Sequence, residues 1–585
     1  MQFKKRNLRR SQAVSTFGPG SIIDLKDESV MMLGIDFWPD NGEEIHEPNL
    51  EKALGVTHFR SPSTEGKKDL PVVLFPKWLV CPSCNRLATV DEFMGLLKNY
   101  NNVKCTKCSK KVYPARLIVA CPHGHIDDFP WVGWVKHGKS PCTCDSPNLE
   151  LYSSGYTATL ADLVVRCKIC KNHRSLSGAL DKKNLEFMSC NGRRPWLLDQ
   201  EQCGEGVIPL QRGASNVYFS VLTGAISIPP WSASIHKKLN KNWKFIKAMP
   251  EIALAATIES MGLHTELNIS VPDVVEAIMN RKNQESDESI PITEFDIRLQ
   301  ECRAIQKTEA VRDLDNDFKT RPALVHPGLQ DWISQVVLVD RLREIRVILG
   351  FSRIDSPDPN PMERISSRMA PISRCRKDWR PAIEVYGEGV FIELNESRII
   401  SWLKNNKSII NRADILNKKY LDLCEKRRWT PAKPISPRFL LAHSFSHALI
   451  RQLALESGYS SSSIRERLYV FEPDASNPDY SCTGFLLYTS TPDSEGSLGG
   501  LVRQGYTENL ANTIKSTINE SAWCSRDPLC MENYEYDPNS LNMAACHSCM
   551  LISETSCEEF NRFLDRAALI GTIDDPNAGF FSDLL

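Results

Sequence analysis

The sequence predicts an α+β multidomain protein with a zinc-ribbon-like N-terminal region, a helical middle, and a mixed α/β C-terminal domain with a four-cysteine metal site. Three observations predict this class. A chain of 585 residues is several times longer than one hydrophobic core supports, so it should divide into several units. Of its 20 cysteines, 16 gather near the front and near the end. Between them the apolar spacing changes from that of short strands to that of helices.

The boundaries follow from changes in this pattern. The stretch from Pro71 to Cys203 is dense in cysteine, whereas Ile235–Gly350 has apolar residues three and four apart, as in helices. After Pro381 the pattern is mixed, and Ser436 with Pro437 is typical of the first turn of a long helix. We therefore expect an N-terminal segment at residues 1–70 and a cysteine-rich zinc-binding region at 71–210. A mainly helical region at 211–360 and a mixed α/β domain at 361–585 should follow.

Composition and charge narrow the function. The chain has 71 basic and 72 acidic residues, which excludes nucleic-acid binding through a uniformly basic surface. The first 20 residues carry no apolar run of signal-peptide length, and no later stretch has transmembrane length. We therefore expect a cytoplasmic protein with no membrane partner. Cytosolic thiols stay reduced, so clustered cysteines there indicate metal sites rather than disulfides.

The first cysteine cluster has the spacing of a zinc ribbon. Cys81-Pro-Ser-Cys84 and Cys105-Thr-Lys-Cys108 are two Cys-x-x-Cys pairs joined by a segment long enough for a hairpin. Each pair can direct two thiolates at one ion, and the two pairs complete a closed tetrahedron. The alternative is two free pairs of surface thiols. We expect structural zinc.

A second set combines one tight pair with two single cysteines. Cys167-Lys-Ile-Cys170 is followed by Cys190 and Cys203, each next to a glycine-containing turn, and we expect these four to share an ion. Between the clusters, Cys121-Pro-His-Gly-His125 and Cys142-Thr-Cys144 leave a further site open. The histidines there can equally serve as hydrogen-bonding groups in a loop.

The third cluster lies near the C-terminus. Cys546-His-Ser-Cys549 is a tight pair, and Cys524 and Cys530 supply two looser ligands. Four thiolates also suit an iron–sulfur cluster. We expect zinc, because nothing in the sequence indicates an electron partner.

The sequence carries none of the common catalytic motifs. It has no Gly-x-x-x-x-Gly-Lys-Ser/Thr phosphate loop, no His-Glu-x-x-His and no Gly-x-Ser-x-Gly, so we expect no ATPase activity from this chain alone. The nearest candidate is the pair His443 and His447, four apart on the predicted helix, with the glycine-rich Gly496–Gly500 downstream. Without a further ligand in view, packed and hydrogen-bonded histidines are the favoured interpretation.

Local charge indicates one candidate DNA surface. From Arg341 to Arg380 there are ten basic and five acidic residues, a net charge of +5. Such a stretch is typical of a confined phosphate-contact surface, with Trp379 available for stacking. A solvated face or a protein interface explains it equally well. The candidate contacts are Arg341, Arg343, Arg346, Arg353, Arg374, Arg376, Lys377 and Arg380.

Several motifs carry a resemblance to a known family. They are Arg9–Gly20, Ala120–Trp131, Gln211–Asn216, Leu342–Arg346 and Gly350–Arg353, together with the C-terminal cysteine cluster. Over nearly its full length the chain resembles the DrmB family of the bacterial DISARM anti-phage system. Its C-terminal part is also similar to a four-cysteine domain appended to certain superfamily 2 helicases.

The resemblance implies a division of labour. A separate helicase ATPase of the DrmA kind pairs with this protein, and the complex engages DNA, single-stranded or duplex with an overhang. It also implies that Cys524, Cys530, Cys546 and Cys549 are metal ligands, and it supplies no catalytic residue.

The sequence therefore predicts a non-catalytic, DNA-binding scaffold subunit of a defence complex. Two alternatives stay open: a metal-dependent nuclease or phosphoesterase that uses the His443/His447 helix, and a DNA-free protein adaptor.

Overall fold

The structure is a computed structural model of the whole chain. It describes residues 8–25, 28–63, 69–94, 103–138, 140–155, 157, 159–229, 238–240, 242–267, 269–285, 292–307, 317–357, 368–427, 434–473, 480–489, 500–532 and 540–585. Within these residues, none of the helices combines the length and apolarity needed to cross a membrane.

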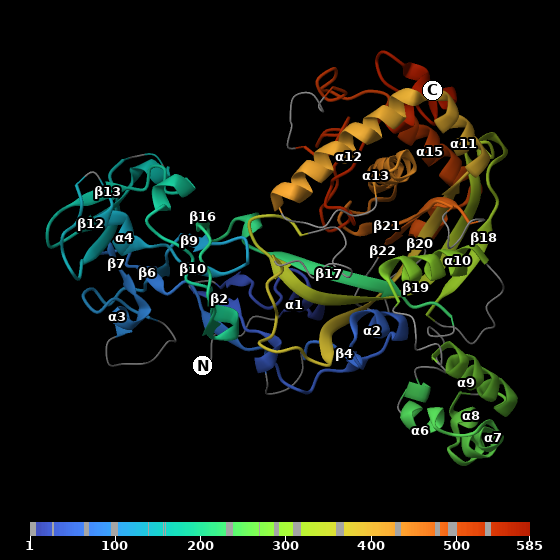
Figure 1. The fold of residues 1–585 in the computed structure, drawn as a ribbon, viewed down its shortest axis with the longest axis horizontal. Helices are drawn as coiled ribbons and strands as arrows, with labels where there is room; N and C mark the ends of the chain where they lie inside the picture. Colours follow the sequence, from blue (N-terminus) through green and yellow to red (C-terminus); the bar gives the residue numbers. More distant parts are fainter. Residues whose placement is uncertain are drawn as a thin grey trace.

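A large antiparallel sheet forms the centre of the molecule (Figure 1). Its strands follow the order β17 (Phe219–Ile226), β19 (Ile333–Ser352), β20 (Trp379–Leu394), β22 (Cys482–Thr489) and β21 (Ile464–Phe471). At the margins, β18 (Lys319–Ala323) pairs with β19, β4 (His58–Arg60) runs parallel to β20, and β3 (Glu44–Ile45) pairs with β4. The sheet therefore joins segments from the whole length of the chain.

Helices cover both faces of this sheet. On one face lie α11 (Glu396–Asn405), α12 (Lys407–Arg427), α13 (Pro437–Ser457), α14 (Gly500–Gln504), α15 (Thr507–Ser521) and α17 (Ala567–Ile570). On the other face, α10 (Glu294–Lys307) contributes Cys302 and Ile305 to a second core. Leu338 belongs to the first core and its neighbour Val339 to the second, because successive side chains of a strand point to opposite faces.

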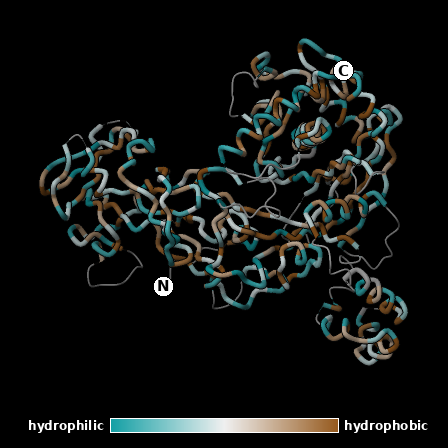
Figure 2. Tube along the Cα trace, viewed as in Figure 1, coloured by the Kyte–Doolittle hydropathy of each residue, from teal (hydrophilic) through white to brown (hydrophobic). Residues whose placement is uncertain are grey.

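Helix α13 begins where the sequence predicts. Ser436 accepts a hydrogen bond from the Phe439 N–H, Pro437 occupies the first turn, and Gly458 ends the helix with φ +71°. The helix is buried almost all round, with Leu441, Phe445 and Leu449 in the main core. In Figure 2, hydrophobic stretches follow the central strands.

The cysteine-rich region contains two small sheets (Figure 1). The first has the order β13 (His173–Ser175), β12 (Leu163–Cys167), β11 (Leu149–Ser153), β7 (Arg86–Thr89), β6 (Trp78–Val80) and β8 (Tyr113–Pro114). The second has the order β10 (Ile126–Asp128), β9 (Leu117–Ala120) and β16 (Ile208–Gln211). The helices α3 (Val90–Met94) and α4 (Trp131–Lys136) pack beside them, and Trp131 and Trp134 are fully buried.

Two smaller parts complete the described fold. The N-terminal segment contains α1 (Arg10–Val14), α2 (Pro48–Leu54) and a sheet of β1 (Ile22–Asp24), β2 (Ser29–Met32) and β5 (Val72–Leu74). A helical unit consists of α6 (Trp243–Lys247), α7 (Glu251–Ser260), α8 (Leu263–Leu267) and α9 (Val271–Glu285) around its own core, and it projects away from the sheet (Figure 1).

The mixed α/β class agrees with the prediction, but the helical middle is wrong in part. Helices α6 to α10 lie in the predicted region, whereas β17 and β19 at either end of it are strands of the central sheet. The apolar residues of β19 fill both faces of the sheet, which hides the two-residue period that marks a half-buried strand. The hydrogen-bonded pair β19 and β20 also spans the predicted boundary at residue 360.

A buried arginine joins the N-terminal segment, the cysteine-rich region and the central sheet. Arg353, directly after β19, is 1% exposed, and its guanidinium donates to the carbonyl oxygens of Gly124 at 2.9 Å, Val217 at 2.6 Å and Gly20 at 2.7 Å. Burial lowers its pKa to about 9, so it stays charged at neutral pH. A Cβ on Gly20 would lie 2.4 Å from the Phe351 ring, so the backbone can pass this close to the ring only at a glycine.

We expect Arg353→Met to destabilise the protein by about 3 kcal/mol, because three buried carbonyl groups lose their donor. Thermal unfolding followed by circular dichroism measures the change. The matched control is Arg376→Met, since exposed Arg376 also donates to one carbonyl, that of Gly55. Equal midpoints for the two variants would contradict the assigned role of Arg353.

Candidate metal centres

Four groups of the described residues contain three or four cysteines each and have the ligands of closed metal sites. Within each group one donor atom per residue lies within 4.8 Å of the others. The groups, named here by position, are knuckle site one (Cys81, Cys84, Cys105, Cys108), hairpin site (Cys121, His125, Cys190, Cys203), knuckle site two (Cys142, Cys144, Cys167, Cys170) and C-terminal site (Cys524, Cys530, Cys546, Cys549).

Local sequence shapes the tight turns of both knuckle sites. After each Cys-x-x-Cys the next residue is left-handed: φ is 59° at Asn85, 53° at Ser109 and 65° at Lys171. Each of these residues donates its N–H to the carbonyl of the first cysteine of its pair, for example Asn85 to Cys81 at 2.9 Å. This closes a one-turn loop that directs both sulfurs to the same side.

The sulfur separations fit a tetrahedral ion. A zinc–sulfur bond of about 2.3 Å gives a tetrahedron with edges of about 3.8 Å. In knuckle site one the Cys81–Cys108 and Cys84–Cys105 sulfur pairs are 3.4 and 3.6 Å apart. In the C-terminal site the corresponding contacts span 3.6 to 3.7 Å. The four thiols therefore suit an ion of this size without rearrangement.

Strand register assembles knuckle site two. Leu149 of β11 pairs with Cys167 of β12, so the chain just before β11 lies beside the Cys167–Cys170 turn. That chain carries Cys142 and Cys144. Their sulfurs lie 3.4 Å from Cys170 and 3.9 Å from Cys167, respectively. Two short cysteine motifs that are separate in sequence thus form one site.

Register also assembles the hairpin site. Ile208 of β16 pairs with Ala120 of β9, which brings Cys203, just before β16, to Cys121, just after β9. The His125 Nδ1 lies 3.3 Å from the Cys121 sulfur and 3.6 Å from that of Cys190. Its other nitrogen, Nε2, lies 2.6 Å from a carboxylate oxygen of Glu201. A carboxylate behind a ligating imidazole is the usual arrangement at metal centres, since it fixes the ring and its tautomer.

These groupings correct one prediction and extend another. Cys167 and Cys170 do not share a site with Cys190 and Cys203, because strand pairing places the two halves in different groups. Of the residues left open between the clusters, Cys121 and His125 belong to the hairpin site, and Cys142 and Cys144 belong to knuckle site two. The predicted sets at knuckle site one and at the C-terminal site come together as predicted. The missing signal was the strand register, which the cysteine spacing does not contain.

Arg566 and Asp527 support the C-terminal site from behind. The Cys524 N–H donates to Asp527 at 2.9 Å, and Asp527 accepts two hydrogen bonds from Arg566 at 2.6 and 2.8 Å. The Arg566 side chain is fully buried and also donates to the Ser521 carbonyl at the end of α15. The positive charge of Arg566 favours thiolates at this site.

Each group contains one thiol that ionises readily. A hydrogen bond from Cys121 lowers the pKa of Cys190 to about 4, and one from Cys530 lowers the pKa of Cys549 to about 5. Burial opposes ionisation of Cys105 and Cys167, but backbone N–H groups of their own turns lower the pKa values to about 6 and about 7. Since the thiolate is the metal ligand, each group contains one thiol that favours the metal-binding form.

Most of the predicted DNA contacts are internal ion pairs or hydrogen bonds. Arg343 is 2% exposed and contacts Glu384 and Ser227, and Arg346 pairs with Glu344 at 2.7 Å. Together with Arg353 they lie on or beside the buried strand β19. Their charges are used in contacts within the protein, which speaks against the prediction that these three contact DNA.

The remaining basic residues of the stretch differ in exposure. Arg380 donates to the Leu349 carbonyl, Arg341 lies over the Tyr386 ring, and Lys377 pairs with Asp36 at 3.2 Å. Only Arg374 and Arg376 of the predicted set are exposed. Arg60 lies over one face of Trp379, so that face is not free for stacking.

His443 and His447 lie inside the protein. Both are 0% exposed, in agreement with the packed interpretation, although they meet Glu466 and Cys557 rather than apolar groups alone. Residues 490–499, which include most of the glycine-rich Gly496–Gly500, are outside the described residues. A carboxylate and a thiol distant in sequence are the partners that sequence reasoning missed.

Comparison with known proteins gives three matches. A family described as a domain of unknown function (DUF8724) matches residues 9–219, which include both knuckle sites and the hairpin site. The MrfA Zn-binding domain matches residues 445–550, which include the C-terminal site. The chain is 36% identical over 577 residues to the DISARM protein DrmB of Bacillus paralicheniformis, covering 96% of this chain and 100% of that protein.

The register-based grouping predicts the metal content of a double variant. We expect Cys142→Ser with Cys144→Ser to lose one metal ion per chain, because knuckle site two depends on both. Elemental analysis of the purified full chain measures the loss, and Cys375→Ser, at an exposed cysteine outside the groups, is the control. Unchanged metal content would favour the grouping of Cys167 and Cys170 with Cys190 and Cys203.

The carboxylate behind His125 should hold the metal of the hairpin site. We expect Glu201→Gln to make one ion per chain easier to remove, with about 10- to 100-fold lower affinity in competition with a chelator. Glu205→Gln is the matched control, because Glu205 lies 3.6 Å from His123, which is not in the group. If both variants release metal alike, Glu201 has no special role.

Proposed function

This chain belongs to the family of the DISARM protein DrmB, and from this we propose that it is a non-catalytic, zinc-stabilised subunit of a cytoplasmic anti-phage complex. In this proposal it docks on a helicase ATPase of the DrmA kind and helps that partner engage foreign DNA. The observation that carries the proposal is the match over nearly the whole length of both chains, together with a metal-binding C-terminal domain.

The chemistry of the four sites supports a structural role for their metal. Each offers four protein donors, and each lies among buried or half-buried cysteines, so a bound ion would have no open position for water or substrate. Three of the sites have four thiols each, and the hairpin site has three thiols and one imidazole. Both ligand sets are typical of structural zinc. When bound, it would cross-link strands too short to stabilise a core by themselves.

Burial of the histidines speaks against the nuclease alternative. A phosphodiester must contact the groups that cleave it, whereas His443 and His447 are both 0% exposed. Their neighbours Leu441, Phe445 and Leu449 belong to the main core. The proposal therefore assigns no catalytic residue to this helix.

The proposed DNA contacts narrow to two exposed arginines. Arg374 donates to the Leu197 carbonyl of the cysteine-rich region and Arg376 to the Gly55 carbonyl of the N-terminal segment, so both are held at the surface of the segment before β20. Arginines held in this way can contact phosphates at a small entropic cost.

We expect the double variant Arg374→Gln and Arg376→Gln to weaken DNA binding about tenfold and to lower the slope of log affinity against log salt by about 1 to 2. Titration of labelled single strands and overhang duplexes at several salt concentrations measures both quantities. Lys418→Gln with Lys426→Gln, exposed on α12, is the control. An unchanged affinity and slope would remove these arginines from the DNA surface.

The subunit role predicts a second set of outcomes. Purified alone with magnesium, manganese or zinc, the chain should hydrolyse neither ATP nor DNA, whereas with the ATPase of its system it should co-purify and change the DNA-stimulated turnover. Metal-dependent cleavage that His447→Ala abolishes would favour the nuclease instead. Equal DNA binding by the ATPase with and without this chain would favour the DNA-free adaptor.

A further inference from the structure

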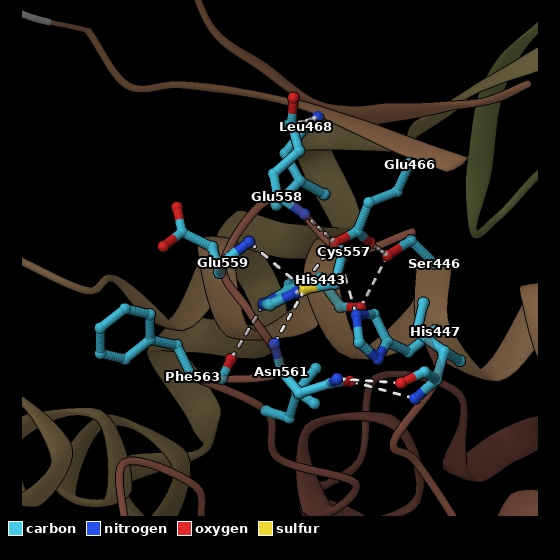
Figure 3. A network of polar contacts seen from close by, with 12 residues as sticks. His443, Ser446, His447, Glu466, Leu468, Cys557, Glu558, Glu559, Asn561 and Phe563 are labelled. Atoms are coloured by element: carbon cyan, nitrogen blue, oxygen red, sulfur yellow. Dashed lines mark hydrogen bonds and ion pairs between the residues drawn. The ribbon is translucent and has the colours of Figure 1, made fainter. Parts of the chain in front are cut away.

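A fifth cluster of metal-ligating side chains lies in the C-terminal half, apart from the four cysteine sites. His443 and His447 extend from α13, Glu466 from β21, and Cys557 from the loop that follows the C-terminal site (Figure 3). Their exposed fractions are 0%, 0%, 1% and 5%. One donor atom from each lies within 4.8 Å of the other three.

Backbone carbonyls fix the orientation of both imidazoles. His443 Nδ1 lies 3.2 Å from the Phe563 oxygen, and His447 Nδ1 lies 3.0 Å from the Met550 oxygen. A carbonyl oxygen only accepts hydrogen bonds, so Nδ1 carries the proton in each ring. The Nε2 atoms of the neutral rings therefore present lone pairs to the interior of the cluster.

The cluster consequently gathers acceptors around one point. His443 Nε2 and His447 Nε2 lie 3.1 and 3.4 Å from the same Glu466 oxygen, Oε1. The Cys557 sulfur lies 3.3 Å from His443 Nε2. In the described part of the chain His447 Nε2 has no hydrogen-bond partner. If His443 Nε2 carried a proton, it could donate to Glu466, but His447 Nε2 would still have no hydrogen-bond partner in the described residues. One cation can instead bind all four donor atoms.

The surroundings of the two anionic ligands also favour a cation. The Cys557 sulfur accepts the N–H groups of Glu559 at 3.3 Å and Asn561 at 3.2 Å, contacts that stabilise a thiolate. The other oxygen of Glu466, Oε2, accepts a hydrogen bond from the Ser446 hydroxyl, which holds the carboxylate in place. Each ligand is thus oriented by a partner outside the cluster, as at established metal centres.

We propose that His443, His447, Glu466 and Cys557 bind a fifth metal ion, a divalent first-row transition metal for which zinc is the expected occupant. Two imidazole nitrogens, one carboxylate oxygen and one thiolate are all zinc ligands, and four of them in a buried site leave no open position. The ion would tie α13 and β21 to the loop after the C-terminal site. His443 and Cys557 lie outside residues 445–550, so this centre extends beyond the matched zinc-binding domain.

The direct test uses the unmodified full chain. Elemental analysis should give five metal ions per chain, and anomalous diffraction at the zinc edge should show a peak between these four side chains in addition to the four cysteine sites. Four ions per chain, with no anomalous peak among His443, His447, Glu466 and Cys557, would overturn the proposal. That result would identify the cluster as an imidazolium–carboxylate network without metal.

Variants test the same assignment in solution. Cys557→Ser and His447→Gln should each reduce the metal content from five ions to four and leave the other sites occupied. Cys424→Ser is the matched control, because Cys424 is also a buried cysteine but belongs to none of the groups. Retention of five ions in both variants would contradict the proposal. If the variants do not fold, the anomalous map of the unmodified chain still decides.

Discussion

The arrangement of the molecule depends on one buried guanidinium. Arg353 directly follows a strand of the central sheet and donates to carbonyl groups of the N-terminal segment, the β9–β10 turn and the segment before β17. The guanidinium carries donors on three nitrogens in one rigid plane, and Nε, Nη1 and Nη2 each donate to a different carbonyl. The turn that it holds at Gly124 lies between Cys121 and His125, so the same contact positions two ligands of the hairpin site.

Metal ligands add to a small hydrophobic core where the strands are short. The sheets of the cysteine-rich region are built from strands of two to five residues, which bury little surface each. Three of the four cysteine groups lie here, each at the end of a strand or turn. A bound ion would fix these ends to one another, which is the role that disulfides have in an oxidising compartment.

Helix α13 links the C-terminal site to the fifth cluster. On one side Arg451 donates to the carbonyls of His547, Ser548 and Leu551, which surround Cys549. Next to it, His447 contacts the Met550 carbonyl with one nitrogen and faces Glu466 with the other. Both groups are thus held by contacts from one helix, whose buried side packs on the central sheet.

The sequence by itself determined the features that depend on neighbours a few residues apart. Each Cys-x-x-Cys turn and the start of α13 at Ser436 are local, because a turn or a cap is closed by hydrogen bonds within four residues. Only the tertiary structure decided which distant groups share a site. Cys144 joins Cys167, and Cys203 joins Cys121, through strand register that no local pattern records. The same holds for the basic stretch, because Arg343, Arg346 and Arg353 form internal contacts once β19 is paired on both sides.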